Sequence, residues 1–270
     1  MRKAGARLES ISRTVMNGLA VVCLAGAGGV GGAHAEPAHP EPPPRGPFHR
    51  QAPYGSAGAF QVRLGGFFPA GGGDVWRDNQ EVFTFDIEDM NSAMVGLSLV
   101  RSATSWLEFG LNADVYDGST SSAERGVVDE FGFPVLHDTR LRLVPVTADL
   151  RILPGGRRSI AGRGPYAPAP VFYFGGGVGA AFWEYEESGE FVDFATPGLP
   201  IFAGTFRADG VALESHLLAG LELPLGPAWG LLFEGRYSWA DDQLDNADFP
   251  EFGRLDLGGP SVYVGASFRF

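Results

Sequence analysis

Cysteine and long apolar runs are the two features that this chain of 270 residues has least of. Its one cysteine, Cys23, lies within the first 35 residues, so the rest of the chain needs no disulfide and offers no reactive thiol. After residue 35, no stretch is apolar for the roughly 18 residues that a membrane helix requires. If the chain crosses a membrane, we therefore expect it to cross with strands.

The first 35 residues have the parts of a secretory signal peptide. A basic segment precedes a small apolar one over 15–32, and Ala33-His34-Ala35 matches an A-x-A cleavage site. The positive charges of the basic segment come from Arg2, Lys3, Arg7 and Arg13. We take 1–35 as the signal peptide, with cleavage after Ala35 and Glu36 as the first mature residue.

Positive charge is scarce in the mature part. Removing the signal peptide takes away four of the 20 basic residues and one of the 32 acidic ones, which leaves 16 against 31. The formal charge changes from -12 to -15. Such a surface repels nucleic acid, so this class of partner is excluded.

Residues 36–57 are too rich in proline to form a strand ladder or a packed core. We expect an extended periplasmic tether there. His39 and His49 lie in this segment, and isolated histidines in a linker are expected to be solvated rather than to bind a metal.

From residue 58 the chain repeats segments of about ten residues in which apolar and polar side chains alternate, as tilted membrane-spanning strands require. Segment 106–116 alternates most regularly, with Phe109 and Leu111 on one face and Glu108 and Asn112 on the other. The pattern predicts an all-β protein, a closed antiparallel transmembrane barrel over 58–270. The eight expected strands are 60–68, 93–101, 106–116, 141–153, 170–183, 212–223, 229–239 and 261–270.

The predicted connections alternate in length, as in outer-membrane barrels with long external loops and short periplasmic turns. The long ones are 69–92, 117–140, 184–211 and 240–260, and the shorter ones are 102–105, 154–169 and 224–228. Two features leave alternatives open. Segments 82–87 and 199–207 could add a hairpin and make ten strands, and Pro145 predicts a bulge or weakened pairing in its strand.

The chain ends inside a strand on an aromatic residue. Val262, Val264, Phe268 and Phe270 lie on the predicted lipid face of this strand. Pairing of this strand with the first one removes both open edges and closes the barrel. We expect the barrel-assembly machinery to bind this C-terminal strand, and the closed barrel to contact outer-membrane lipid and lipopolysaccharide.

Four segments together resemble the OmpW-like and related small outer-membrane barrels. They are LRLVPVTADLRIL at 141–153, PYAPAPVFYFGGGVGAAF at 165–182, FEGRYSW at 233–239 and SVYVGASFRF at 261–270. The resemblance covers most of 59–270. It implies an eight-stranded barrel in the bacterial outer membrane that acts as a passive site or narrow path for small apolar molecules.

Charged residues occupy the predicted inner wall, where they lose water and must pair with one another. We expect a structural plug of ion pairs, with Glu108 beside Arg151, His216 opposite Arg236 and Glu214 on the diagonal. The plug residues are Arg63, Glu108, Asp114, Asp149, Arg151, Glu214, His216, Glu222, Glu234, Arg236 and Arg269.

Catalysis is not expected, although Glu214, Ser215 and His216 have the residue types of a hydroxyl nucleophile and its base. Adjacent strand residues point to opposite faces, so Ser215 should face lipid while His216 faces inward. We therefore predict a protein that is not an enzyme and that uses no cofactor and no metal. The acids of 241–252 lack the ordered spacing of a calcium loop.

The external loops combine acidic residues with phenylalanines, notably in 81–90, 129–136, 190–194 and 241–252. These phenylalanines either contact an external partner or pack within hairpins that extend beyond the membrane. Two functions remain open at this point. One is a narrow passive channel or binding site for small hydrophobic molecules, and the other is an adhesin-type structural barrel that presents acidic, aromatic loops.

Overall fold

The structure is a computed structural model that describes residues 58–157, 169–193, 196–197, 200–226, 228–250 and 252–270. The predicted signal peptide 1–35 and tether 36–57 lie outside the described residues. The barrel is therefore described by itself.

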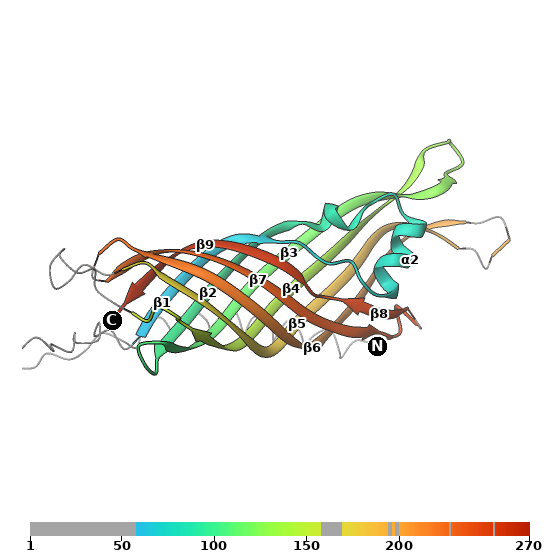
Figure 1. Cartoon of the computed structure of the whole chain (residues 1–270). Helices are drawn as coiled ribbons and strands as arrows, with labels where there is room; N and C mark the ends of the chain where they lie inside the picture. The colour runs from blue at the N-terminus through green and yellow to red at the C-terminus, as the bar shows by residue number, and fades with distance from the viewer. Residues whose placement is uncertain (1–57, 158–168, 194–195, 198–199, 227, 251) are drawn as a thin grey trace, which may run out of the picture. The chain divides into compact units, whose positions relative to one another are not determined.

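Eight antiparallel strands form a closed ring (Figure 1). Each strand pairs with its neighbour in the chain, β6 pairs with β7, and the ring closes because β9 pairs with both β7 and β1. The short β8 lies outside the ring and pairs with the end of β7, and its Leu255 also bridges to Gly73. The strands are β1 (Gly58–Phe67), β2 (Ser92–Ser102), β3 (Leu107–Val128), β4 (Pro134–Ile152), β5 (Val171–Val192), β6 (Ile201–Pro224), β7 (Trp229–Leu244), β8 (Gly253–Asp256) and β9 (Gly259–Arg269).

The predicted eight-stranded barrel is confirmed, and the ten-strand alternative is wrong. Residues 82–87 lie at the end of a helix and in the loop after it, while 201–207 form the beginning of β6. The C-terminal strand pairs with the first strand as predicted, with Ala59 opposite Arg269 and Phe67 opposite Ser261.

The strands on one side of the ring are much longer than predicted. β3, β5 and β6 contain 22, 22 and 24 residues, so the expected loops 117–140 and 184–211 consist largely of strand. The error has a physical cause. Outward positions change from apolar to charged near Asp117, and this change resembles the end of a membrane strand, although the alternation of buried and exposed residues continues.

The β3–β4 and β5–β6 hairpins therefore extend beyond the other strands at one end of the ring (Figure 1). We call this end the long-hairpin end, and the opposite end, with the connections β2–β3, β4–β5 and β6–β7, the short-turn end.

Pro145 weakens the ladder between β3 and β4 without adding a residue to it. Pairing lapses between Ala113–Val146 and Tyr116–Leu143, but the register is the same on both sides of the lapse. The register of this pair of strands shifts only near the tip of the hairpin, between Ala123 and Val128. The sequence expectation of weakened pairing is thus met, and that of a bulge is not.

The outer wall of the ring is apolar on every strand towards the short-turn end. Phe109, Phe233 and Phe268 are exposed there, as predicted, together with Leu64 and Leu213. The inward residues beside them are buried and include charged ones, such as Arg63, Glu108 and Glu234, as well as the apolar Leu232. A soluble barrel has the opposite arrangement, with its apolar side chains inside.

A helix and an apolar core fill the long-hairpin end. α2 (Asp74–Val82) and the short 3₁₀-helix η2 (Ile87–Met90) lie between β1 and β2 along the chain. Val75 and Trp76 of α2 are fully buried in this core. No helix among the described residues is long and apolar enough to cross a membrane.

Candidate functional site

The titratable residues predicted to face inward all lie in the interior of the ring. Each is at most 8% exposed, although the strands that carry them are far apart in the chain. They form two ionic clusters and a separate pair, and several of their partners differ from those expected.

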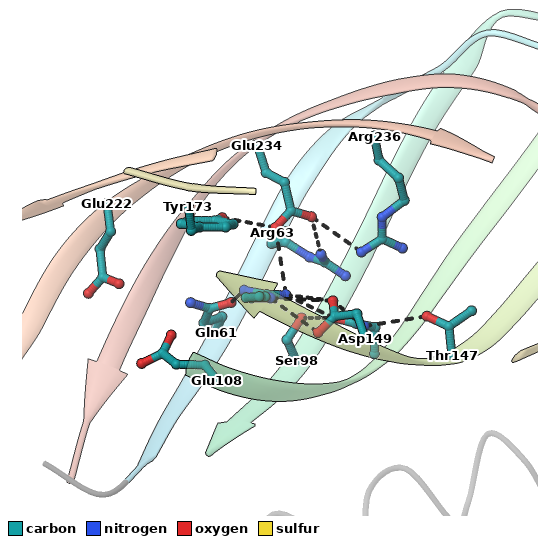
Figure 2. A network of polar contacts seen from close by, with 12 residues as sticks. Gln61, Arg63, Ser98, Glu108, Thr147, Asp149, Tyr173, Glu222, Glu234 and Arg236 are labelled. Carbon is teal, nitrogen blue, oxygen red and sulfur yellow. Dashed lines mark hydrogen bonds and ion pairs between the residues drawn. The ribbon is translucent and has the colours of Figure 1, made fainter. Parts of the chain in front are cut away.

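Glu234 is the centre of the larger cluster (Figure 2). Its carboxylate accepts hydrogen bonds from Arg63 Nη1 at 2.6 Å, Tyr173 Oη at 2.9 Å and Arg236 Nη2 at 3.2 Å. Asp114 accepts from the same two arginines, at 2.8 Å from Arg63 and 3.0 Å from Arg236. Two carboxylates thus hold two guanidinium groups across the ring from β1, β3 and β7.

Arg151 completes this central cluster. Its guanidinium donates to Asp149 at 3.1 Å, to Gln61 Oε1 at 3.0 Å and to Asn112 Oδ1 at 3.3 Å, and lies 5.2 Å from the centre of the Tyr173 ring. The arginines of the central cluster are balanced by an equal number of carboxylates, because Asp149 joins the two already described. Buried charges require such balance. Arg63 Nε and Arg236 Nε have no hydrogen-bond partner among the described atoms.

The predicted pair Glu108–Arg151 is wrong, although the two residues lie opposite each other in the β3–β4 register. Arg151 turns towards the central cluster, whereas Glu108 binds Arg157 with Oε1–Nε at 2.6 Å. The sequence analysis did not predict Arg157 as a partner because Arg157 lies in a turn, where side chains do not alternate between two faces.

A second cluster closes the short-turn end. Arg157 bridges Glu108 and Glu222, with 3.2 Å between its Nη2 and Glu222 Oε2. Arg269 of β9 donates to Glu222 from Nε at 2.7 Å and lies 3.8 Å from Glu108. A turn side chain and the closing strand therefore seal this end together.

His216 is not opposite Arg236, as the sequence analysis expected. In the β6–β7 register His216 faces Ser238, and Arg236 faces Leu218, so the turn was centred one residue too early. His216 Nδ1 lies 3.6 Å from Glu214 Oε1, and neither ring nitrogen has a hydrogen-bond partner among the described atoms.

Ser215 cannot act with His216, because the side chains on either side of it in the strand are buried while Ser215 is part-exposed on the outer wall. Among the described residues, no group of three or more His, Cys, Asp or Glu side chains could hold a metal ion.

The sequence analysis missed a second serine–histidine contact, in the β3–β4 hairpin. Ser122 Oγ and His137 Nδ1 are 3.0 Å apart, and Thr139 Oγ1 lies 3.2 Å from His137 Nε2. The Phe83 ring covers the imidazole, with the ring centres 3.6 Å apart. Burial lowers the pKa of His137 from 6.5 to about 4. The imidazole is therefore neutral at pH 7, with a hydroxyl at each nitrogen, and has a packing role.

Polar contacts attach α2 to the strands around it. Trp76 Nε1 donates to the Asp256 carbonyl of β8 at 2.8 Å. Asn79 Nδ2 donates to Glu187 Oε1 of β5 at 2.8 Å and contacts Tyr185 Oη. Burial raises the pKa of Glu187 above its usual value.

The apolar core around α2 closes the ring above the ionic clusters. It includes Phe67, Val75, Trp76, Phe83, Phe85, Met90, Met94, Tyr116, Leu141, Leu143, Trp183, Tyr185, Leu244, Phe249, Leu255 and Tyr263. A small cavity lies between this core and the polar layer, lined among others by Met94, Leu143, Pro145, Glu214 and Arg236. The volume of this cavity that the centre of a water molecule can occupy is about 10 Å³, so the cavity holds roughly one water.

No family model matches the chain, and no curated protein matches it. Solved structures of small barrels are similar in fold. The outer membrane protein OprG from Pseudomonas aeruginosa is 13% identical with a TM-score of 0.42, over 82% of this chain and 98% of that one.

Two further structures have similar values. A major outer membrane protein from Thermus thermophilus is 14% identical with a TM-score of 0.40, over 79% of this chain and 100% of that one. The attachment invasion locus protein Ail of Yersinia pestis is 13% identical with a TM-score of 0.34, over 79% and 99%. These are similarities of fold with small outer-membrane barrels, the class that the sequence pattern resembled, and they say nothing of function.

Proposed function

We propose that this chain is an outer-membrane barrel with a sealed lumen, which anchors a rigid extracellular extension for contact with an external partner. The observation that carries this proposal is a change in the polarity of the outer and inner faces along the strands. Near the short-turn end the outer wall is apolar, and beyond Asp117 and Arg142 it is charged.

The change on the outer wall occurs at one height on four neighbouring strands. Asp117 lies opposite Arg142, Arg142 opposite Glu184, and Glu184 opposite Asp209. Below this row β3 has an apolar face from Leu107 to Val115, which is about the length that a tilted strand needs to cross a bilayer. The row thus supports a membrane boundary, with the long-hairpin end outside the cell.

The filled interior supports an anchor rather than an axial channel. Among the described residues, ion pairs and a small apolar cluster that includes Leu153, Leu218 and Leu232 occupy the interior from the short turns to Glu234, and the apolar core around α2 occupies it above. An eight-stranded ring has room only for its own side chains or one small ligand.

Liposome swelling tests the sealed lumen. We expect vesicles that contain the purified barrel to take up neither small sugars nor small apolar solutes faster than protein-free vesicles. The variant Glu222→Ala with Arg269→Ala removes one ionic layer but leaves the central cluster and the apolar core, so it should swell no faster than the wild-type protein. Vesicles with an open porin are the positive control. Swelling by the wild-type protein at the rate of an open porin would refute the proposal.

A second candidate is a binding site for small apolar molecules, as the family resemblance implied. The cavity beside Pro145 favours it, because Met94 and Leu143 line this cavity where pairing of β3 with β4 lapses. Such a ligand requires the two strands to separate, since the room is now about that of one water. Titration with a fluorescent naphthylamine tests this candidate, and Leu143→Trp should abolish binding if the cavity is the site.

A further inference from the structure

The turn between β3 and β4 is rigidly organised by one carboxylate. Asp129 Oδ1 accepts the backbone N–H groups of Phe131 at 2.9 Å and of Phe133 at 2.7 Å. The Asp129 N–H donates to the Phe133 carbonyl at 2.8 Å. Gly132 between the two phenylalanines has φ 84°, a conformation that favours glycine. The backbone on both sides of the two rings is therefore held in one conformation.

The two rings held by this turn point into solvent. Phe131 is 75% exposed and Phe133 is 66% exposed, and the neighbouring Val128 and Leu136 are also more than half exposed. We call these four residues the tip patch. Other phenylalanines of the same end behave differently, because Phe83 and Phe249 are buried in the core around α2. Both alternatives for the acidic, aromatic loops therefore occur, and the rings of the tip patch are more exposed than Phe202 at 44%.

The tip patch lies far from the apolar belt. β3 continues for 11 residues from Asp117 to Val128, which is about 35 Å along a strand. In Figure 1 this hairpin, coloured green, projects beyond the rest of the ring. Lipid of the membrane that holds the barrel therefore does not cover the patch, and exposed apolar groups on a preorganised turn are typical of a contact site.

The charge of the whole long-hairpin end indicates the kind of partner. Segments 69–92, 117–142, 184–209 and 240–256 together contain 23 acidic residues and six arginines. Asp129 and Glu130 lie in the turn itself. An anionic bilayer surface and a second copy of this chain are both repelled by such a charge. A cationic surface is attracted.

We propose that the tip patch is the docking site for a basic polypeptide segment with interleaved apolar side chains. The apolar side chains pack on Phe131 and Phe133, a guanidinium or ammonium group stacks on an exposed ring, and a second cation pairs with Glu130. This inference rests on the proposed function and names the partner's chemistry and the residues that contact it.

The test uses the barrel in zwitterionic nanodiscs, with empty discs as the blank. The probe is a synthetic amphipathic peptide of lysine and leucine, compared with one of glutamate and leucine. We expect Phe131→Ser with Phe133→Ser to weaken binding of the lysine peptide at least 10-fold. The matched control is Val82→Ser with Phe202→Ser, which removes two other exposed apolar groups of the same end, and it should change binding less than twofold.

Two single variants separate the parts of the site. Asp129→Ala keeps both rings but loosens the turn, so binding should weaken about threefold or more. Glu130→Gln removes one charge, so binding should weaken and should also depend less on salt.

Three results would overturn the inference. The glutamate peptide could bind as tightly as the lysine peptide, or the tip and control variants could lose the same amount of binding. The third is that the patch binds protein-free zwitterionic vesicles. Swelling measured on the same preparation separates the two proposals. If there is no swelling and no difference between tip and control variants, only the docking site fails.

Discussion

The row that contains Arg142 divides the barrel into a lower and an upper half. The polarity of the outer and inner faces is opposite in the two halves. In the lower half of β5, Phe172 and Phe174 face outward while Tyr173 lies inside with the ionic cluster. In the upper half Glu184 faces outward while Trp183 is buried in the apolar core. The same strand thus has an apolar outer face beside an ionic interior below, and a charged outer face beside an apolar interior above.

This difference predicts which substitutions destabilise the whole ring and which act at one end only. In the lower half the interior holds balanced ion pairs beside a small apolar cluster of Leu153, Val171, Tyr173, Leu218 and Leu232, so removal of one charge leaves another unpaired. In the upper half the interior is a packed apolar core, so the loss of an aromatic side chain leaves a cavity.

The largest expected effect is that of Glu234→Ala. It leaves Arg63, Arg236 and Arg151 with too few carboxylates, which should lower the free energy of unfolding by about 3 to 5 kcal/mol. Urea unfolding in lipid vesicles, followed by tryptophan fluorescence, measures it. An unchanged unfolding midpoint would show that the central cluster does not stabilise the lower half.

Trp76→Ala should have the next largest effect, and only in the upper half. The fully buried indole leaves a cavity and a lost hydrogen bond to β8, a cost of about 3 to 4 kcal/mol. Hydrogen exchange should show faster opening of 74–82 with no change in the strands below. Val82→Ala, on an exposed position of the same helix, is the control. Loss of protection throughout the ring would contradict the separation of the two halves.

His137 should make the upper half sensitive to pH. Its pKa is about 4 in the folded protein and near 6.5 when exposed, so the unfolded state binds more protons between these values. Its contribution to stability is therefore complete above pH 6.5 and is lost as the pH falls towards 4, by about 2 to 3 kcal/mol.

The measurement is the pH dependence of hydrogen exchange in β3 and β4, compared between the wild-type protein and His137→Asn. Glu187 has a raised pKa, which changes stability with pH in the opposite direction. Both proteins contain Glu187, so its contribution cancels in the difference between them. An identical pH profile for both proteins would rule out the role of His137.

The smallest effect is expected at the boundary between the halves. Arg140 binds Asp117 through Nε at 2.8 Å and holds the pKa of that carboxyl below its usual value, but both side chains are exposed. Arg140→Gln should cost less than about 1 kcal/mol, and salt should reduce the difference further. A larger, salt-insensitive loss in urea unfolding would mean that the boundary is less solvated than its exposure indicates.

Much of the ring could be predicted from the sequence, and the errors in strand length follow from one assumption. Strands were expected to end where their outer face becomes charged, as at Asp117 and Glu184, so the upper half was taken for loops. α2 was missed as well, because its nine residues give only one buried stripe, including Val75 and Trp76, within a predicted loop. The inward charges could be placed on the correct wall, but most of their partners could not.

Alternation alone determined the wall on which each strand side chain lies, because the two-residue period of a strand is local and needs no knowledge of neighbours. It left eight or ten strands open, and the closed ring of the tertiary structure decided for eight. The tertiary structure decided which residues meet. Arg63 and Glu234 are 171 residues apart and come together only because the ring closes in one register. It also decided that α2 fills the upper half, since the space for it exists only where the four long strands β3 to β6 extend beyond the row that contains Arg142.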